Sequence, residues 1–186
     1  HLASYFKEVL SYHQIIRSGK VSLESIPRKE KNLLLYLLLV IRPQMKTILE
    51  IGSTLFEMID GFDIVDAYLS QNNSGISRVD TKACHYVGVE FSELLALASK
   101  VLHPQHNITV HRSMSAVEET IDLVYDRSVT NYAFETAKEI ADYANLGDVA
   151  LLNSYFSLEE TFVSSRLGKQ LTYFSLEESI EQMNKP

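Results

Sequence analysis

The sequence predicts a doubly wound α/β fold with a mostly parallel sheet and an N-terminal helical cap. Two apolar runs carry this prediction, Thr47-Ile-Leu-Glu-Ile-Gly52 and, further along, Tyr86-Val-Gly-Val-Glu90. Each ends in an acidic residue or a glycine, and a helix-like pattern follows it. Buried parallel strands are typically short apolar runs of this kind. Strands that alternate with helices indicate a parallel sheet with right-handed crossovers.

Residues 1–45 are predicted to form the helical cap. Apolar side chains recur at helical spacing from Leu2 to Ile16, and a break follows at residues 22–27. A second helix is predicted from Lys29 to Ile41, because Pro43 disfavours its continuation. The apolar run that ends this helix is too short to cross a bilayer.

Residues 46–186 are predicted to form the α/β core. The predicted strands span residues 47–52, 86–91, 108–111, 121–126, 148–153 and 171–174. Predicted helices span residues 55–69, 93–102 and 131–145; Gly61 weakens the first, Ser92 caps the second, and Gly147 is expected to close the third. The strings Ser157-Leu-Glu-Glu160 and Ser175-Leu-Glu-Glu178 have capping-box spacing, so each is expected to begin a late helix.

Composition narrows the functional classes. The 186 residues are expected to form one domain, residues 1–186. A net charge of −7 argues against a nucleic-acid partner. A single cysteine, Cys84, excludes an intrachain disulfide and is typical of a reducing, cytoplasmic setting, where we interpret it as an ordinary semi-buried thiol. We expect no membrane partner and consider a homo-oligomer possible. The chain begins with His1 rather than Met, so we expect the natural N-terminus to be missing.

Two strand-end carboxylates suggest a ligand. Open α/β sheets bind ligands beyond the carboxyl ends of their strands, and Glu90 ends the second predicted strand. A carboxylate there can accept hydrogen bonds from both hydroxyls of a ribose, which indicates a nucleoside-containing cofactor. The alternative is a solvated carboxylate at the start of the next helix. Glu50 lies near the end of the first run, where it could instead only cap backbone N–H groups.

From Thr47 to Phe174 the order of these pieces resembles the class I S-adenosylmethionine-dependent methyltransferases. Their first strand carries an acid and a glycine-rich turn, matched here by Glu50 and Gly52, and their second strand ends in a ribose-binding acid, matched by Glu90. The resemblance implies S-adenosyl-L-methionine as the cofactor. The implied cofactor-binding residues are Glu50, Gly52, Ser53, Glu90, Phe91, Met114, Ser115 and Asp126.

Residues 50–57 and 122–136 more narrowly resemble sugar O-methyltransferases linked to polysaccharide synthesis. This resemblance implies methyl transfer to a hydroxyl of a sugar or another small acceptor. Asp126 is the candidate base for the hydroxyl proton. Arg127 could hold an anionic sugar or the cofactor carboxylate, or form an ion pair with Asp126 or Glu135. Tyr132 could stack on a sugar ring or pack at the base of its helix, and Asn131 belongs to the same polar cluster.

One departure from the family pattern keeps a second function open. The family has three alternating glycines, but Thr54 and Phe56 stand at the second and third positions. Glycine tolerates φ > 0 and leaves room for a ligand, whereas these side chains do neither well. A binding or regulatory protein that has the fold without catalysis is therefore the alternative. A nicotinamide-dependent oxidoreductase is a weaker one, because the Gly-x-Gly-x-x-Gly turn is absent.

No metal ligands are assigned from the sequence. Asp126 and Asn153 follow neighbouring predicted strands, as Mg²⁺ ligands do in some O-methyltransferases, but Leu152 stands where an additional carboxylate is usual. The histidines at positions 85, 103, 106 and 111 have no ligand spacing such as His-x-x-x-His. His111 follows the third predicted strand and is interpreted as a surface residue.

Overall fold

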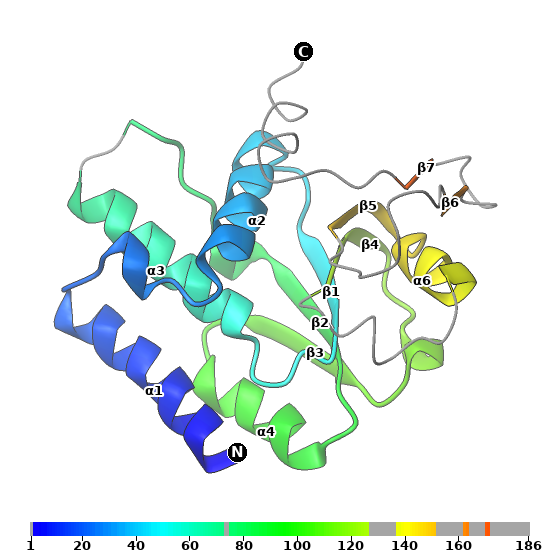
Figure 1. Ribbon diagram of the computed structural model, residues 1–186, viewed down its shortest axis with the longest axis horizontal. Helices are drawn as coiled ribbons and strands as arrows, with labels where there is room; N and C mark the ends of the chain where they lie inside the picture. Colours follow the sequence, from blue (N-terminus) through cyan, green and yellow to red (C-terminus); the bar gives the residue numbers. More distant parts are fainter. Residues whose placement is uncertain (1, 73–74, 127–136, 152–161, 164–169, 172–186) are drawn as a thin grey trace.

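A five-stranded parallel sheet in the order β3-β2-β1-β4-β5 forms the centre of the molecule (Figure 1). The structure is a computed structural model, and it describes residues 2–72, 75–126, 137–151, 162–163 and 170–171. The strands are β1 (Thr47–Ile51), β2 (His85–Val89), β3 (Asn107–His111), β4 (Ile121–Tyr125) and β5 (Gly147–Leu151). From β1 the chain adds β2 and β3 on one side of the sheet, and then crosses back to add β4 and β5 on the other side of β1. This change of direction in the strand order is that of a doubly wound α/β fold, so the predicted fold class is confirmed.

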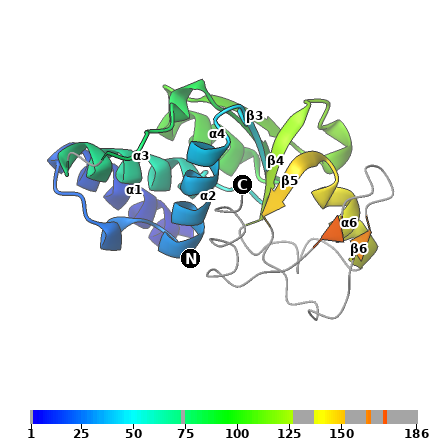
Figure 2. The ribbon, with the colours of Figure 1, turned by 90° about the horizontal axis from the view of Figure 1, so that it is seen from above.

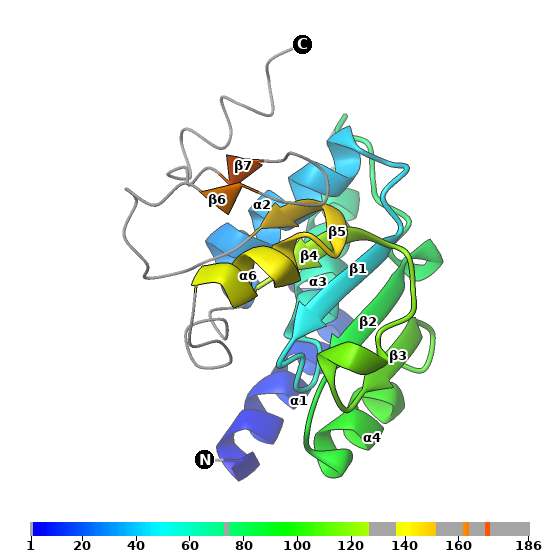
Figure 3. The same cartoon turned by 90° about the vertical axis from the view of Figure 1, so that its right-hand side faces the viewer.

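Both faces of the sheet are covered, which explains the unbroken apolar runs. Ile48 and Tyr86 point to one face and join a core with α2 (Lys29–Ile41) and α3 (Glu57–Gln71). Leu49 and Val87 point to the other face, where they pack with Tyr143 of α6 (Ala137–Ala144). Figure 3 shows α3 and α6 on opposite faces of the sheet. Successive side chains along each strand therefore enter different cores.

The N-terminal cap packs along α3. Both α1 (Leu2–Ser18) and α2 contact this helix, and Figure 2 shows the three helices gathered on one side of the sheet. Gly61, which was predicted to weaken α3, lies where α2 comes closest. A β-carbon at Gly61 would lie 2.6 Å from Nδ2 of buried Asn32. The glycine therefore allows the two helices to approach.

The predicted helix after β2 is α4 (Glu93–Leu102), and Ser92 caps it by accepting a hydrogen bond from the Leu95 amide at 3.4 Å. The prediction that Gly147 closes a helix is wrong. Gly147 is the first residue of β5, and its φ is not positive. Its missing side chain leaves room for Val124, whose Cγ2 would lie 2.9 Å from an added β-carbon.

Other boundaries differ by a few residues. The helix α3 begins at Glu57 rather than residue 55, because residues 52–56 form a turn. Three 3₁₀ turns, η1 (Leu23–Ser25), η2 (Thr81–Ala83) and η3 (Met114–Ala116), connect longer elements. The two-residue strands β6 (Phe162–Val163) and β7 (Gln170–Leu171) pair antiparallel as a second sheet; the sequence predicted only the second of them.

Several predictions lie outside the described residues: the late helices that begin at Ser157 and Ser175, the first part of the 131–145 helix, and strand residues 152–153 and 172–174. In the part of the chain that the structure describes, each helix is too short or too polar to span a bilayer.

Candidate functional site

The turn after β1 has left-handed backbone at three alternating positions. Gly52, Thr54 and Phe56 have φ values of 62°, 49° and 55°. These are the three positions at which the resembled family has glycine. For a residue with a side chain, this conformation costs roughly 1–2 kcal/mol. The backbone geometry that glycine favours is therefore retained although two of the three glycines are absent.

Contacts from three directions hold this turn. The hydroxyl of Thr54 lies 2.7 Å from the phenol of Tyr5 on α1, which places the cap over the turn. The amide of Gly52 donates to the Val89 carbonyl at 2.8 Å. Phe56 is fully buried on β2. Together these contacts can offset the strain of the left-handed residues.

Glu90 joins the turn to the start of α4. One carboxylate oxygen accepts a hydrogen bond from the Thr54 amide at 3.1 Å, and the other accepts one from the Ser92 amide at 2.8 Å. Glu90 is buried, with 7% exposure, so the interpretation as a solvated carboxylate is wrong. A carboxylate has about four lone-pair positions, so each oxygen can accept one more hydrogen bond.

Glu50 lies on the central strand at the same edge. Its side chain is completely buried, and it pairs in register with Gly88 of β2. A buried ionised group is stable only with compensating polar partners. Such a carboxylate, one residue from the end of β1, is more typical of a site than of a strand residue placed only for packing.

Tyr143 was not identified from the sequence, yet it determines the geometry of this edge. Its phenol accepts a hydrogen bond from the Ile51 amide at 3.0 Å and donates one to the Tyr125 carbonyl at 2.8 Å. It thus joins the ends of β1 and β4 from α6. Burial raises the pKa of the Tyr143 phenol well above its usual value, so the group remains protonated as this donor role requires.

The other predicted cofactor-binding residues follow the same strand ends. The strand order places residues 114–115, 90–91, 50–54 and 126 in sequence along one edge of the sheet. Phe91 is 66% exposed. Met114 is half-buried against the core that contains Leu49, Val87 and Tyr143. Ser115 is exposed, and its hydroxyl lies 3.0 Å from that of Ser113. Ser53 is completely buried, so it does not face solvent at this edge.

The predicted catalytic residues are described only in part. Asp126 directly follows β4, is 1% exposed, and donates its amide to the Leu151 carbonyl at 3.0 Å. Arg127, Asn131 and Tyr132 lie outside the described residues, as does Asn153. Asp126 therefore lies at the carboxyl end of β4, one strand away from the turn.

No family model and no curated protein matches this chain. Solved structures do. One is a TehB-like SAM-dependent methyltransferase from Corynebacterium glutamicum. The match covers 98% of this chain and 84% of that protein, at 15% sequence identity and a TM-score of 0.46. Another is an O-methyltransferase from Bacillus cereus in complex with SAH. That match covers 76% of this chain and 61% of the O-methyltransferase, at 15% sequence identity and a TM-score of 0.42.

A third similar structure is DesVI from Streptomyces venezuelae. The match covers 62% of this chain but only 45% of DesVI, at 13% sequence identity and a TM-score of 0.39.

Proposed function

We propose that this chain binds S-adenosyl-L-methionine at the carboxyl ends of β1 and β2 and transfers a methyl group to a hydroxyl of a sugar or another small acceptor. The observation that supports this most is the left-handed turn at residues 52–56, whose Thr54 amide is bonded to the Glu90 carboxylate. Left-handed residues other than glycine cluster at ligand-binding and active sites, where the surrounding structure enforces them.

The residues of this edge suit the cofactor. Glu90 has acceptor capacity for ribose hydroxyls, since each of its oxygens has received only one backbone hydrogen bond from the turn and the helix start. The backbone from Gly52 to Thr54 would hold the amino-acid end. Met114 is partly exposed after β3, where an apolar thioether can pack on the adenine. When bound, the sulfonium supplies an electrophilic methyl carbon.

Asp126 would take the proton. Asp126 would accept the hydroxyl proton while the acceptor oxygen displaced S-adenosylhomocysteine from the methyl carbon that the bound cofactor would supply. Arg127 and Tyr132 would position the acceptor, the first by charge and the second by stacking on a sugar ring. Much of the rate enhancement in such a transfer comes from positioning, which rigid strand ends provide.

The alternative is a binding or regulatory protein without catalysis. One observation favours it: both oxygens of Glu90 already accept backbone amides, so this carboxylate also has a purely structural role. The two functions make different predictions for cofactor binding and turnover.

The first test is isothermal titration of S-adenosylmethionine and S-adenosylhomocysteine into the folded protein and its Glu90→Ala variant. Glu93→Ala is the matched control, because the Glu93 side chain is 90% exposed on the first turn of α4. Saturable binding that Glu90→Ala loses and Glu93→Ala keeps would support the cofactor site. A folded wild-type protein that binds neither compound would contradict the proposal.

A second test separates enzyme from binding protein. A panel of sugars is incubated with the protein and methyl-labelled cofactor, and Asp126→Asn is assayed in parallel. Labelled product that the variant forms at least ~100-fold more slowly is the expected result, since a positioned base contributes about 10²–10⁴-fold. Cofactor binding by the wild type, with no methyl transfer to the sugar panel or to other small hydroxyl compounds, would favour the regulatory alternative.

A further inference from the structure

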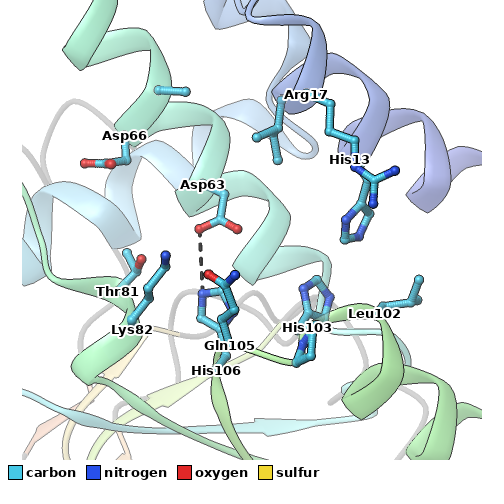
Figure 4. Close-up of a pocket in the computed structure, with 13 residues that line it drawn as sticks. His13, Arg17, Asp63, Asp66, Thr81, Lys82, Leu102, His103, Gln105 and His106 are labelled. Carbon is cyan, nitrogen blue, oxygen red and sulfur yellow. Dashed lines mark ion pairs between the residues drawn. The ribbon is translucent and has the colours of Figure 1, made fainter.

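Side chains from α1, from α3 and from the residue that follows α4 meet beneath the cap, next to the turn at residues 52–56. His13 lies on α1, Asp60 on α3, and His103 directly after α4. His13 Nε2 is 3.1 Å from Asp60 Oδ1, and His103 Nε2 is 3.8 Å from Asp60 Oδ2. One potential ligand atom from each residue lies within 4.8 Å of the others. Figure 4 shows the two imidazoles projecting from α1 and from the end of α4 into the same pocket.

The carboxylate at the centre of this cluster is completely buried between the two imidazoles. Asp60 forms an ion pair with His13 at 3.1 Å and lies 3.8 Å from His103. An isolated buried carboxylate is strongly unfavourable. A carboxylate in such a place therefore requires a cation close to it, which an imidazolium or a bound metal ion can supply.

The His103 imidazole is almost completely buried after the end of α4, and a hydrogen bond decides which of its nitrogens can bind a metal. Its Nε2 lies 3.0 Å from the Leu55 carbonyl, which can only accept, so Nε2 carries the hydrogen. The nitrogen that could bind a metal is therefore Nδ1, not the Nε2 that lies 3.8 Å from Asp60. Histidines that bind metals commonly donate their second N–H to a backbone carbonyl in this way, which fixes the ring and its tautomer.

We propose that His13, Asp60 and His103 bind one divalent transition-metal ion of the zinc type. Two imidazoles and one carboxylate are a common zinc ligand set that leaves one position for water. Metal–ligand distances of about 2.0–2.1 Å require only a modest contraction of the cluster. His13 can supply it, because its side chain is 21% exposed and lies on the outermost helix.

The neighbouring cavity supplies room for the fourth ligand. It has a volume of about 430 Å³ and is lined by His13, His103 and the pair formed by Asp63 and His106. His106 Nε2 lies 3.6 Å from Asp63 Oδ1. A metal-bound water in this cavity would have polar groups nearby and a path for entry.

The metal would have a structural consequence for the strand-end site. It would join α1, α3 and the end of α4, and the Leu55 carbonyl that orients His103 belongs to the turn at residues 52–56. Bound metal would thus fix the cap over that turn. This role is independent of methyl transfer, and its test needs no cofactor.

The test uses untagged, chelator-treated, full-length protein titrated with Co²⁺ and then with Zn²⁺. We expect one Co²⁺ per chain with a visible absorption band, displaced by Zn²⁺. The variants His13→Gln and Asp60→Asn should weaken binding by at least ~100-fold, since even outer partners of a metal site are worth about 10–100-fold. His111→Asn should bind normally; it is a matched control, because His111 lies 2.9 Å from Glu119 in a histidine–carboxylate pair elsewhere.

Two outcomes would overturn the proposal. One is a folded wild-type protein, verified by circular dichroism, that binds neither ion saturably. The other is unchanged binding in His13→Gln, whose partly exposed position makes it the variant that most surely folds. In that case the cluster is a metal-free ion pair between His13 and Asp60, consistent with the raised pKa that contact with Asp60 gives to His13.

Discussion

Phe56 packs so closely on Gly88 that only glycine fits at position 88 of β2. A β-carbon at Gly88 would lie 2.6 Å from Cζ of Phe56 and 2.3 Å from Oγ of Ser53. Phe56 also contacts Tyr86 edge-on, with ring centroids 6.4 Å apart. The third position of the glycine pattern has therefore become a core side chain, and a glycine on the neighbouring strand provides its space.

Replacement of Gly88 by alanine should destabilise the protein. The added methyl group must displace Phe56 or Ser53, and overpacking of this kind costs about 1–3 kcal/mol. Urea unfolding followed by circular dichroism measures the difference. Gly75→Ala is the control, because a β-carbon there meets nothing within 4 Å. Equal free energies of unfolding for Gly88→Ala and wild type would show that the turn does not pack on β2 as described.

Thr54 provides a test of backbone strain. A glycine variant is usually less stable than an alanine variant, but at this left-handed position we expect the opposite order of stability. Both Thr54→Ala and Thr54→Gly lose the contact with Tyr5, but only glycine relieves the φ of 49°. We expect Thr54→Gly to be more stable than Thr54→Ala by about 1 kcal/mol. Chemical denaturation of the two variants measures the difference directly.

The control for this comparison is an ordinary helical position. Leu97 is 65% exposed on α4, and there glycine should be less stable than alanine by about 0.5–1 kcal/mol. If the alanine variant is the more stable one at both positions, the left-handed conformation of Thr54 is contradicted.

The sequence predicts the elements well because their causes are local. The helix Lys29–Ile41 was predicted with its observed bounds, since an apolar pattern and a following proline define it. The left-handed turn was harder, because threonine and phenylalanine disfavour the conformation that neighbouring contacts impose. Gly147 was misassigned for a related reason: its role depends on Val124 of the adjacent strand, which no local pattern reveals.

Long-range convergence explains what the sequence did not predict. His13, Asp60 and His103 have no ligand spacing along the chain, and only the packing of three helices brings them together. Tyr143 likewise resembles any buried aromatic residue of an amphipathic helix. Its two hydrogen bonds to strand ends depend on the sheet order. Candidate site residues that follow strands could be named from the sequence because a parallel sheet aligns the ends of its strands.

Cys84 should react only when the protein unfolds. The thiol is 1% exposed, and burial raises its pKa, so the reactive thiolate is disfavoured. We expect a disulfide-exchange reagent such as DTNB to react on the order of 10³-fold more slowly with native than with urea-unfolded protein, as expected for a group exposed only by large-scale opening. Because this is the chain's single cysteine, the reaction reports one site. Rapid reaction of the native protein would contradict the burial of Cys84, which lies between η2 and β2.

Tyr143→Phe should remove one atom and weaken both the fold and the strand-end site. The variant keeps the ring but leaves the Ile51 amide and the Tyr125 carbonyl without the phenol, at a cost of about 1–3 kcal/mol for each buried group. We expect the free energy of unfolding to fall by about 2–4 kcal/mol in total. Tyr12→Phe is the matched control, because that phenol donates to Glu8 at the surface and should matter by less than about 0.5 kcal/mol.

The Ile51 amide immediately precedes Gly52, so the same variant should also loosen the turn. Amide hydrogen exchange measures this separately from global stability. In Tyr143→Phe we expect faster exchange at Ile51 and Thr54 than at β3, where the strand contacts are unchanged. Uniformly faster exchange would instead mean that Tyr143 supports the core as a whole, without a specific role in holding the ends of β1 and β4 together.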